Sequence, residues 1–189
     1  MKYKTIKLSV LLNSLVLMAS ALSIAYVPKA APGDTATAGA GKQWPTSRFV
    51  VSGDCVTDNL TGLIWAKNGS LLGAGTWGSG STSGTAQYEV LQMNNTSGAL
   101  GYHLCGYSDW RLPNINELQS LVNYAATQHN STPAAWLNSQ GFTNVQTDAY
   151  WSSTGYGGSY SWYVNFNDGS SGYGDVNNTF YVWPVRGGQ

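Results

Sequence analysis

The chain has 189 residues, of which only 10% are charged, and its nine basic and nine acidic side chains give a formal net charge of zero. This charged fraction lies far below the roughly 25% of an average soluble domain, whereas the aromatic content of 13% argues against a disordered chain. Beyond the three lysines among the first seven residues, the sequence contains no cluster of Lys or Arg, so the rest of the chain offers no electrostatic case for binding nucleic acid or strongly sulfated polysaccharide. Low charge combined with many Tyr, Trp, Asn and Ser residues is typical of an exported β-rich or binding protein and not of a cytosolic enzyme.

The first 25 residues have the pattern of a secretory signal peptide. Three lysines precede an apolar run from Leu8 to Ala25, and small residues offer cleavage sites near Ala25 or Ala30. The alternative is an uncleaved membrane anchor, because the run has about the minimum length for a span. Cleavage after Ala25 would leave six basic and nine acidic side chains, a net charge of −3.

A flexible linker is predicted over residues 26–43, which are rich in Ala, Gly, Pro and Thr and show no apolar periodicity. The folded domain is expected over residues 44–189. No second apolar run of membrane length occurs, so no membrane span is expected once the signal is cleaved.

Two short strands are predicted at 48–51 and 63–66, joined as a hairpin through the turn-rich stretch 54–62. A loop dense in Gly and Ser follows over 68–84. The first helix is predicted over 85–93, where apolar residues recur at helical spacing on one side.

The stretch from Gly106 to Val122 joins a turn, a short apolar strand and a helix predicted over 114–125. Asn114 stands at the N-cap position and Glu117 follows three residues later, which is the arrangement of a capping box. Arg111 lies between two apolar residues and is interpreted as a structural hub for carbonyl or carboxylate groups, with a ligand site as the alternative. The predicted structural hub comprises Trp110, Arg111, Pro113, Asn114 and Glu117.

The last third of the chain is predicted to be β-rich. A long connection over 127–149, functional or simply packed on the core, precedes strands at 150–154, 161–167, 172–176 and 180–185. Strands, then two helices, then a C-terminal strand meander predict an α+β fold with an antiparallel sheet.

Cys55 and Cys105 are the only cysteines, and an even count in an exported chain predicts a disulfide between them. A metal site would need further ligands, and the spacing of the two histidines, His103 and His129, does not supply them. No metal and no cofactor are therefore expected.

The sequence lacks the residue patterns of the common catalytic sites. It has no Gly-x-Ser-x-Gly motif, phosphate-binding loop or zinc motif. Its two glutamates, Glu89 and Glu117, have the positions of helix-surface or capping residues, so a carboxylate pair for acid–base catalysis is not indicated. We therefore expect a protein that is not an enzyme.

Polar and aromatic side chains gather between residues 154 and 179. In the predicted strand 161–167, Trp162, Val164 and Phe166 are expected on one face and Tyr163, Asn165 and Asn167 on the other. Tyr and Asn supply rigid contact area and adaptable hydrogen bonds, which suit the faces and hydroxyl groups of sugars. The alternative is an ordinary solvated meander. The predicted ligand-binding residues are Tyr156, Tyr160, Tyr163, Asn165, Asn167, Tyr173, Asp175, Asn177 and Asn178.

Several ordered motifs lie at a characteristic spacing: residues 55–65, residues 104–118 with Ser-Asp-Trp-Arg-Leu-Pro-Asn, residues 150–154, residues 162–166 with Asp168-Gly169, and residues 182–187. Together they resemble the Lcl C-terminal domain family, named for a bacterial collagen-like adhesin. The family usually has Arg at the position where this chain has Trp183.

The resemblance implies a C-type lectin-like fold, related to formylglycine-generating enzymes and to the variable proteins of diversity-generating retroelements. It implies a secreted, periplasmic or cell-surface bacterial binding module, adhesin-like, that recognises a glycan or surface protein through the 154–179 face. It does not imply catalysis or calcium-dependent sugar binding. The alternatives are an envelope or appendage component that forms homo-oligomers through this face, and a retroelement-type variable binding protein.

Overall fold

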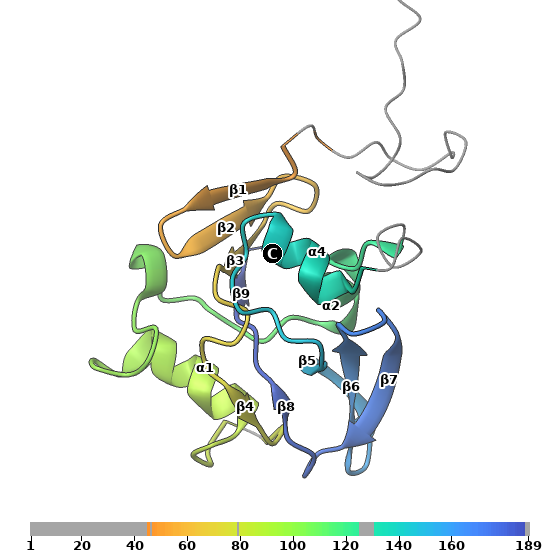
Figure 1. Cartoon of the computed structure of the whole chain (residues 1–189). Helices are drawn as coiled ribbons and strands as arrows, with labels where there is room; N and C mark the ends of the chain where they lie inside the picture. Colours follow the sequence, from red (N-terminus) through yellow and green to blue (C-terminus); the bar gives the residue numbers. More distant parts are fainter. Residues whose placement is uncertain (1–44, 46, 79, 125–130, 188–189) are drawn as a thin grey trace, which may run out of the picture.

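The computed structural model describes residues 45, 47–78, 80–124 and 131–187, so the predicted signal peptide and the predicted linker lie outside the described residues. The described chain is an α+β structure with two mainly antiparallel sheets (Figure 1). Within the described residues, no helix is both long enough and apolar enough to cross a membrane.

The smaller sheet has four antiparallel strands in the order β1-β2-β3-β9. Its strands are β1 (Phe49–Ser52), β2 (Cys55–Asp58), β3 (Leu63–Ala66) and β9 (Val185–Arg186). The prediction that the strands at 48–51 and 63–66 pair directly is wrong, because β2 lies between them and pairs with both. The turn from Asp58 to Gly62 is enough to reverse the chain, with the Gly62 N–H donating to the Asp58 carbonyl at 2.8 Å, so the residues before it are free to form a strand.

The larger sheet has five strands in the order β4-β8-β5-β6-β7, and all its pairs are antiparallel except β5 with β8. Its strands are β4 (Ala74–Gly75), β5 (Ala149–Gly157), β6 (Tyr160–Asn165), β7 (Ser171–Asp175) and β8 (Phe180–Tyr181). The predicted meander is confirmed for β5, β6 and β7. A single last strand over 180–185 is wrong: the chain leaves the larger sheet after Tyr181 and joins the smaller one at Val185. Pro184, which has no N–H to donate, lies in the crossing between them.

The first helix, α1 (Ala86–Asn95), is confirmed, with Thr85 as its N-cap. The second, α2 (Ile115–Ser120), ends five residues earlier than the predicted range 114–125, because Leu121 and Val122 leave the helix and enter the core.

The connection predicted over 127–149 contains a further helix, α4 (Pro133–Ser139), which the sequence analysis missed. Its signal was present, since Thr132 caps the helix and Pro133 occupies its first turn. A short 3-10 helix, η1 (Leu104–Gly106), precedes the central extended stretch.

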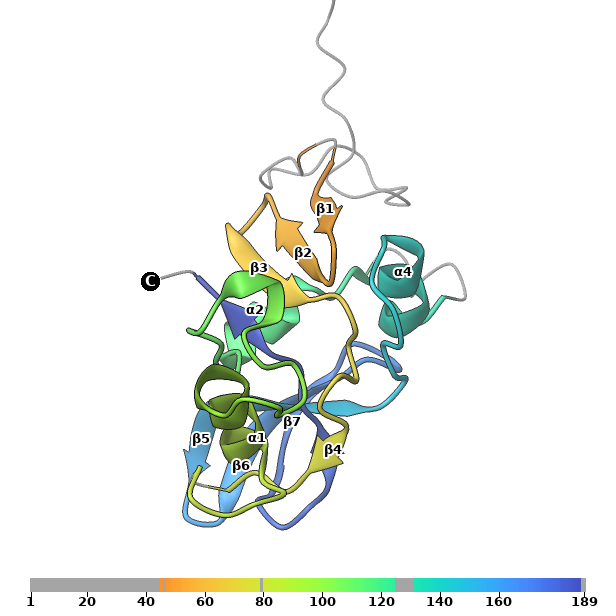
Figure 2. The ribbon, with the colours of Figure 1, turned by 90° about the vertical axis from the view of Figure 1, so that its left-hand side faces the viewer.

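The two faces of the larger sheet pack in different hydrophobic clusters. Tyr150 and Trp151 are adjacent on β5 and fully buried, yet Tyr150 belongs to the cluster with α2 and α4, and Trp151 to the cluster with α1. Figure 2 shows α1 lying over β5 and β6, and in Figure 1 α1 lies to the left of these strands while α2 and α4 lie above them. Buried side chains therefore lie on both faces of this sheet.

Candidate functional site

The central extended segment, residues 107–114, leads into α2 and pairs with β9, the last strand of the smaller sheet. Arg111 and Val185 exchange backbone hydrogen bonds of 2.9 and 3.0 Å. The Arg111 guanidinium donates to both carboxylate oxygens of Glu117, at 2.8 and 2.7 Å, and to the Gly187 carbonyl at 2.7 Å. Its donors are thus directed at the protein itself, which is the arrangement of a structural hub.

The capping box at the start of α2 is confirmed. The Asn114 side chain accepts from the Glu117 N–H at 2.9 Å, and the Glu117 carboxylate accepts from the Asn114 N–H at 2.8 Å. Burial opposes ionisation of Glu117, but the hydrogen bonds from Arg111 and from Asn114 outweigh it and lower the pKa of this carboxyl. In turn, the hydrogen bonds to Glu117 raise the pKa of the Arg111 guanidinium. The pair is therefore charged at neutral pH.

The other hub residues also bind the protein. Trp110 is buried, and its indole N–H donates to the Leu104 carbonyl at 3.3 Å. The Pro113 carbonyl accepts from the Ser153 N–H on β5 at 2.8 Å. The segment therefore contacts η1 and the larger sheet as well as β9.

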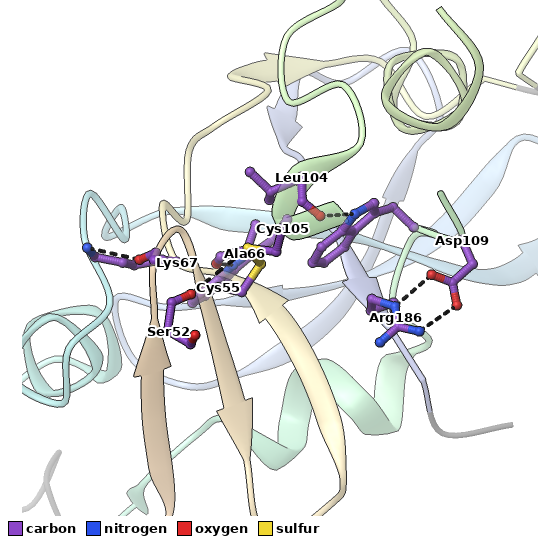
Figure 3. Close-up of a disulfide and its surroundings, with 11 residues drawn as sticks. Ser52, Cys55, Ala66, Lys67, Leu104, Cys105, Asp109 and Arg186 are labelled. Atoms are coloured by element: carbon purple, nitrogen blue, oxygen red, sulfur yellow. Dashed lines mark hydrogen bonds and ion pairs between the residues drawn. A yellow bond between two sulfur atoms is a disulfide. The ribbon is translucent and has the colours of Figure 1, made fainter. Parts of the chain in front are cut away.

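The predicted disulfide between Cys55 and Cys105 is confirmed, and it ties β2 to η1 (Figure 3). Beside it, Arg186 donates two hydrogen bonds to Asp109, at 2.6 and 3.0 Å, and this pairing lowers the pKa of the Asp109 carboxyl. The Arg186 guanidinium also lies 3.7 Å from the centre of the Tyr107 ring. This corner of the molecule is held by covalent, ionic and cation–π contacts together.

One face of β6 is buried at one end and open at the other. Tyr160, Trp162 and Val164 alternate along this face, and Val164, opposite Ser171 on β7, is fully buried. The Ser171 hydroxyl accepts from the Gln119 side chain of α2 at 2.6 Å. Burial on this face decreases along β6 away from this contact: Trp162 is half-buried, and Tyr160, two residues before it, is 45% exposed.

Four rings at the open end form what we call the aromatic patch: Tyr156, Tyr160, Trp162 and Tyr173. Tyr173 lies opposite Trp162 in the β6–β7 ladder. The Tyr156 and Tyr173 rings are parallel, with centroids 4.0 Å apart, while the Tyr160 ring stands at 89° to Tyr173 at 5.9 Å. The Trp162 ring meets both members of the stacked pair edge-on. Tyr156 is 50% and Tyr173 51% exposed, so a sizeable aromatic surface faces solvent.

Three more of the predicted binding residues lie at the end of this patch. Asp175 is opposite Tyr160 in the last rung of the β6–β7 ladder. Its carboxylate accepts from the backbone and side-chain N–H groups of Asn177, each at 2.9 Å, in an exposed turn that also contains Asn178. The structure thus brings six of the nine predicted residues to one end of the sheet.

The other three predicted residues lie elsewhere. Tyr163 is on the opposite face of β6, half-buried, with its ring 4.9 Å from that of Phe180. Asn165 and Asn167 lie at the other end of the hairpin, where the Asn165 side chain accepts from the Asn167 N–H at 2.9 Å. The 154–179 segment is therefore not one continuous surface.

Trp162 belongs to the aromatic patch but was not among the residues predicted from the sequence to bind a ligand. Alternation correctly placed it on the face of Val164 and Phe166, but a strand pattern does not say where the cover of a face ends. Tyr160, two residues before it beside a glycine-rich hairpin, was the available signal.

Charge near the patch is low and negative. Residues 149–185 contain no Lys, Arg or His, and their only charged residues are Asp168 and Asp175. Hydrogen bonds from the Ser170 hydroxyl and N–H lower the pKa of Asp168. All three arginines of the described chain form ion pairs, namely Arg48 with Asp58, Arg111 with Glu117 and Arg186 with Asp109. The first pair is buried, and its Asp58 lies in the stretch 54–62 that the sequence indicates only as turn-rich.

A groove of 470 Å³ runs between α1 and the central extended segment. Apolar and polar side chains line this groove. Its charged lining residues are Arg111 and Glu117, which already bind each other. Leu91, at 45% exposure, is its open apolar wall. The lining residues include Gln87, Leu91, Trp110, Arg111, Glu117 and Ser153.

The side chains considered for acid–base chemistry serve other contacts. Glu89 accepts from the Gly84 N–H at 3.0 Å, and His103 stacks on Tyr102 with ring centroids 3.9 Å apart. His129 lies outside the described residues. In the part of the chain that the structure describes, no three His, Cys, Asp or Glu side chains are grouped to hold a metal ion.

Comparison with known families supports the resemblance stated above. A search of curated proteins finds no match. The family model described as the Lcl C-terminal domain matches residues 54–186, which span β2 to β9 and include the disulfide, the structural hub and the aromatic patch. Since this match extends over more than half of the sequence, the chain belongs to the Lcl C-terminal domain family.

Proposed function

We propose that this protein is an exported, non-catalytic binding module of C-type lectin-like fold that attaches, adhesin-like, to a glycan or a surface protein. The observation that carries the proposal is the aromatic patch, where three tyrosines about half exposed lie together on one sheet end. A family of surface-associated domains and a disulfide suited to an oxidising compartment support the location.

The chemistry of the patch favours recognition. Tyr side chains give large contact area at a low entropic cost, because each has only two rotatable side-chain angles. Contacts within the patch orient the rings before any ligand arrives, so little further ordering is needed on binding. The exposed Asn177 side chain, which donates to Asp175, adds a hydrogen-bonding group at its end.

The location of the charged groups supports a role without catalysis. A general acid or base needs a carboxyl or imidazole that can reach a ligand. Glu117 is engaged by Arg111, and Asp109 by Arg186. These carboxylates stabilise the protein itself, so binding is the function that the arrangement favours.

A structural or oligomer-forming role is the second candidate, and the edge strand β1 favours it. Val50 and Val51 are 44% and 43% exposed on this strand, which among the described residues pairs only with β2. An edge strand with exposed apolar side chains is suited to pairing with another chain.

The test is a screen of the full chain, produced under oxidising conditions, against glycan arrays and envelope proteins, with calcium and with a chelator. Tyr156→Ala and Tyr173→Ala should abolish binding while the melting temperature stays close to that of the wild type. Tyr102→Ala, at an exposed tyrosine outside the patch, is the matched control and should bind normally. Binding that survives both patch variants would reject the proposal. A defined oligomer with β1 protected from hydrogen exchange would favour the second candidate.

A further inference from the structure

The charges around the aromatic patch restrict its ligand. A sulfate, phosphate or uronate group needs a cation or a set of free N–H donors as partner. The patch and its flanking strands have no basic side chain, and Asp175 lies beside Tyr160. The arginines elsewhere in the described chain are already paired with carboxylates. An anionic ligand would meet a carboxylate here and no compensating charge.

The orientation of the rings restricts the ligand further. Tyr156 and Tyr173 stack on each other at 4.0 Å, which leaves no space for a ligand between them. Tyr160 stands at 89° to Tyr173, so the two rings form a corner and not a flat strip. A corner suits one ring-shaped unit, with a face against one aromatic ring and an edge against the other. A long flat polymer surface would need coplanar rings.

The rim of the corner is polar and uncharged apart from Asp175. Tyr hydroxyls both donate and accept hydrogen bonds, and the exposed Asn177 side chain lies beside Asp175 in the next turn. A pyranose combines these demands, since its axial C–H groups form an apolar face and its hydroxyls point outward.

We infer that the aromatic patch binds an uncharged pyranose, a neutral hexose or N-acetylhexosamine, at an end or branch of a glycan. This inference rests on the proposed function and names the ligand class of the same site. Recognition then depends on ring contact and hydrogen bonds, and not on charge.

The experiment measures binding of the full disulfide-bonded chain to short oligosaccharides of glucose, galactose, mannose and N-acetylglucosamine. Each is presented next to a sulfated form of the same backbone. We expect a neutral member to bind and its sulfated form to bind at least about ten-fold more weakly, with less than about a two-fold change in Kd between about 0.05 and 0.5 M salt. Tyr160→Ala and Tyr173→Ala should each weaken binding at least about ten-fold, as truncation of a central aromatic contact does. Tyr102→Ala should leave it unchanged.

Two other outcomes separate this inference from the proposed function. A preference for sulfated forms, or binding to a surface protein with no glycan bound, would overturn the inference and leave the proposed function standing, provided that the patch variants lose binding. Binding to any partner that is unaffected by Tyr160→Ala and Tyr173→Ala would overturn both.

Discussion

The two ends of one face of β6 have similar apolar composition and opposite surroundings. At one end Val164 is fully buried, and the Phe166 ring just beyond the strand packs against Tyr150 and Trp183. At the other end Trp162 and Tyr160 belong to the aromatic patch and face solvent. Alternation along a strand determines which face a side chain occupies, whereas the helices packed on the sheet determine whether that face is buried.

This difference separates stability from recognition along one strand. Side chains at the covered end should contribute to the free energy of unfolding, and those at the open end should contribute mainly to binding. The following substitutions test that separation, beginning with the largest expected loss of stability.

Phe166→Ala should lower the free energy of unfolding by about 3–5 kcal/mol, because it removes a fully buried ring and leaves a cavity. Urea unfolding followed by tryptophan fluorescence measures the loss. A decrease in the free energy of unfolding below about 1 kcal/mol would show that the buried end of this β6 face contributes little to stability and does not differ in this respect from the open end.

Cys105→Ser should lower the free energy of unfolding by about 3–4 kcal/mol, the chain-entropy value for a loop with a sequence separation of 50. The disulfide joins β2 to η1, away from the patch, so folded protein should keep its ligand affinity. Thermal unfolding with and without a reductant gives the magnitude. Equal stability of the wild type with and without the reductant would contradict this stabilising role of the disulfide.

Glu117→Gln should lower the free energy of unfolding by about 2 kcal/mol at neutral pH, since it removes the charge that binds Arg111 while an amide can still complete the capping box. The folded pKa of Glu117 lies below its ordinary value of 4.5. Its stabilising contribution is therefore complete above about pH 4.5 and is lost as the pH falls through the folded pKa. Urea titrations at a series of pH values should show the wild type and the variant converging in acid. A constant difference across that range would refute this account.

Tyr173→Ala should have the smallest effect on stability, at most about 1 kcal/mol, from loss of stacking on Tyr156. Its effect on ligand binding should be the largest of the four substitutions. Unfolding and binding measured in parallel on this variant and on Phe166→Ala compare the open and the buried end of the β6 face directly. Similar stability losses in both would show that the patch is part of the core.

Local chemistry made much of the fold predictable. The capping box at Asn114 and Glu117, the Cys55–Cys105 pairing and the hairpin around residues 166–170 each depend on residues whose preferences are strong. The missed elements include β2, β4 and α4. The strands β2 and β4 are short, and α4 has a start signal at Thr132 and Pro133 but lies in a stretch without clear periodicity.

The candidate site was predictable only in part. Its residue types can be read from the sequence, whereas the positions of its side chains relative to one another depend on tertiary packing. The tyrosines at 156, 160 and 173 could be found from their exposed context in a glycine-rich meander. Excluding Tyr163 required knowing that Phe180 packs on the other face of β6, and including Trp162 required knowing where α2 ends. Both facts depend on tertiary packing.

The pairing of every described arginine with a carboxylate has a kinetic consequence. The arginines are neutralised by their partners, and residues 149–185 carry charge only at Asp168 and Asp175, so the patch exerts little long-range attraction and a partner would arrive at the unsteered association rate of about 10⁵–10⁶ M⁻¹ s⁻¹. Differences in affinity between partners must then come from dissociation. Under the inference that the patch binds one small unit at a time, firm attachment to a surface would require many copies of the protein to engage repeated units together.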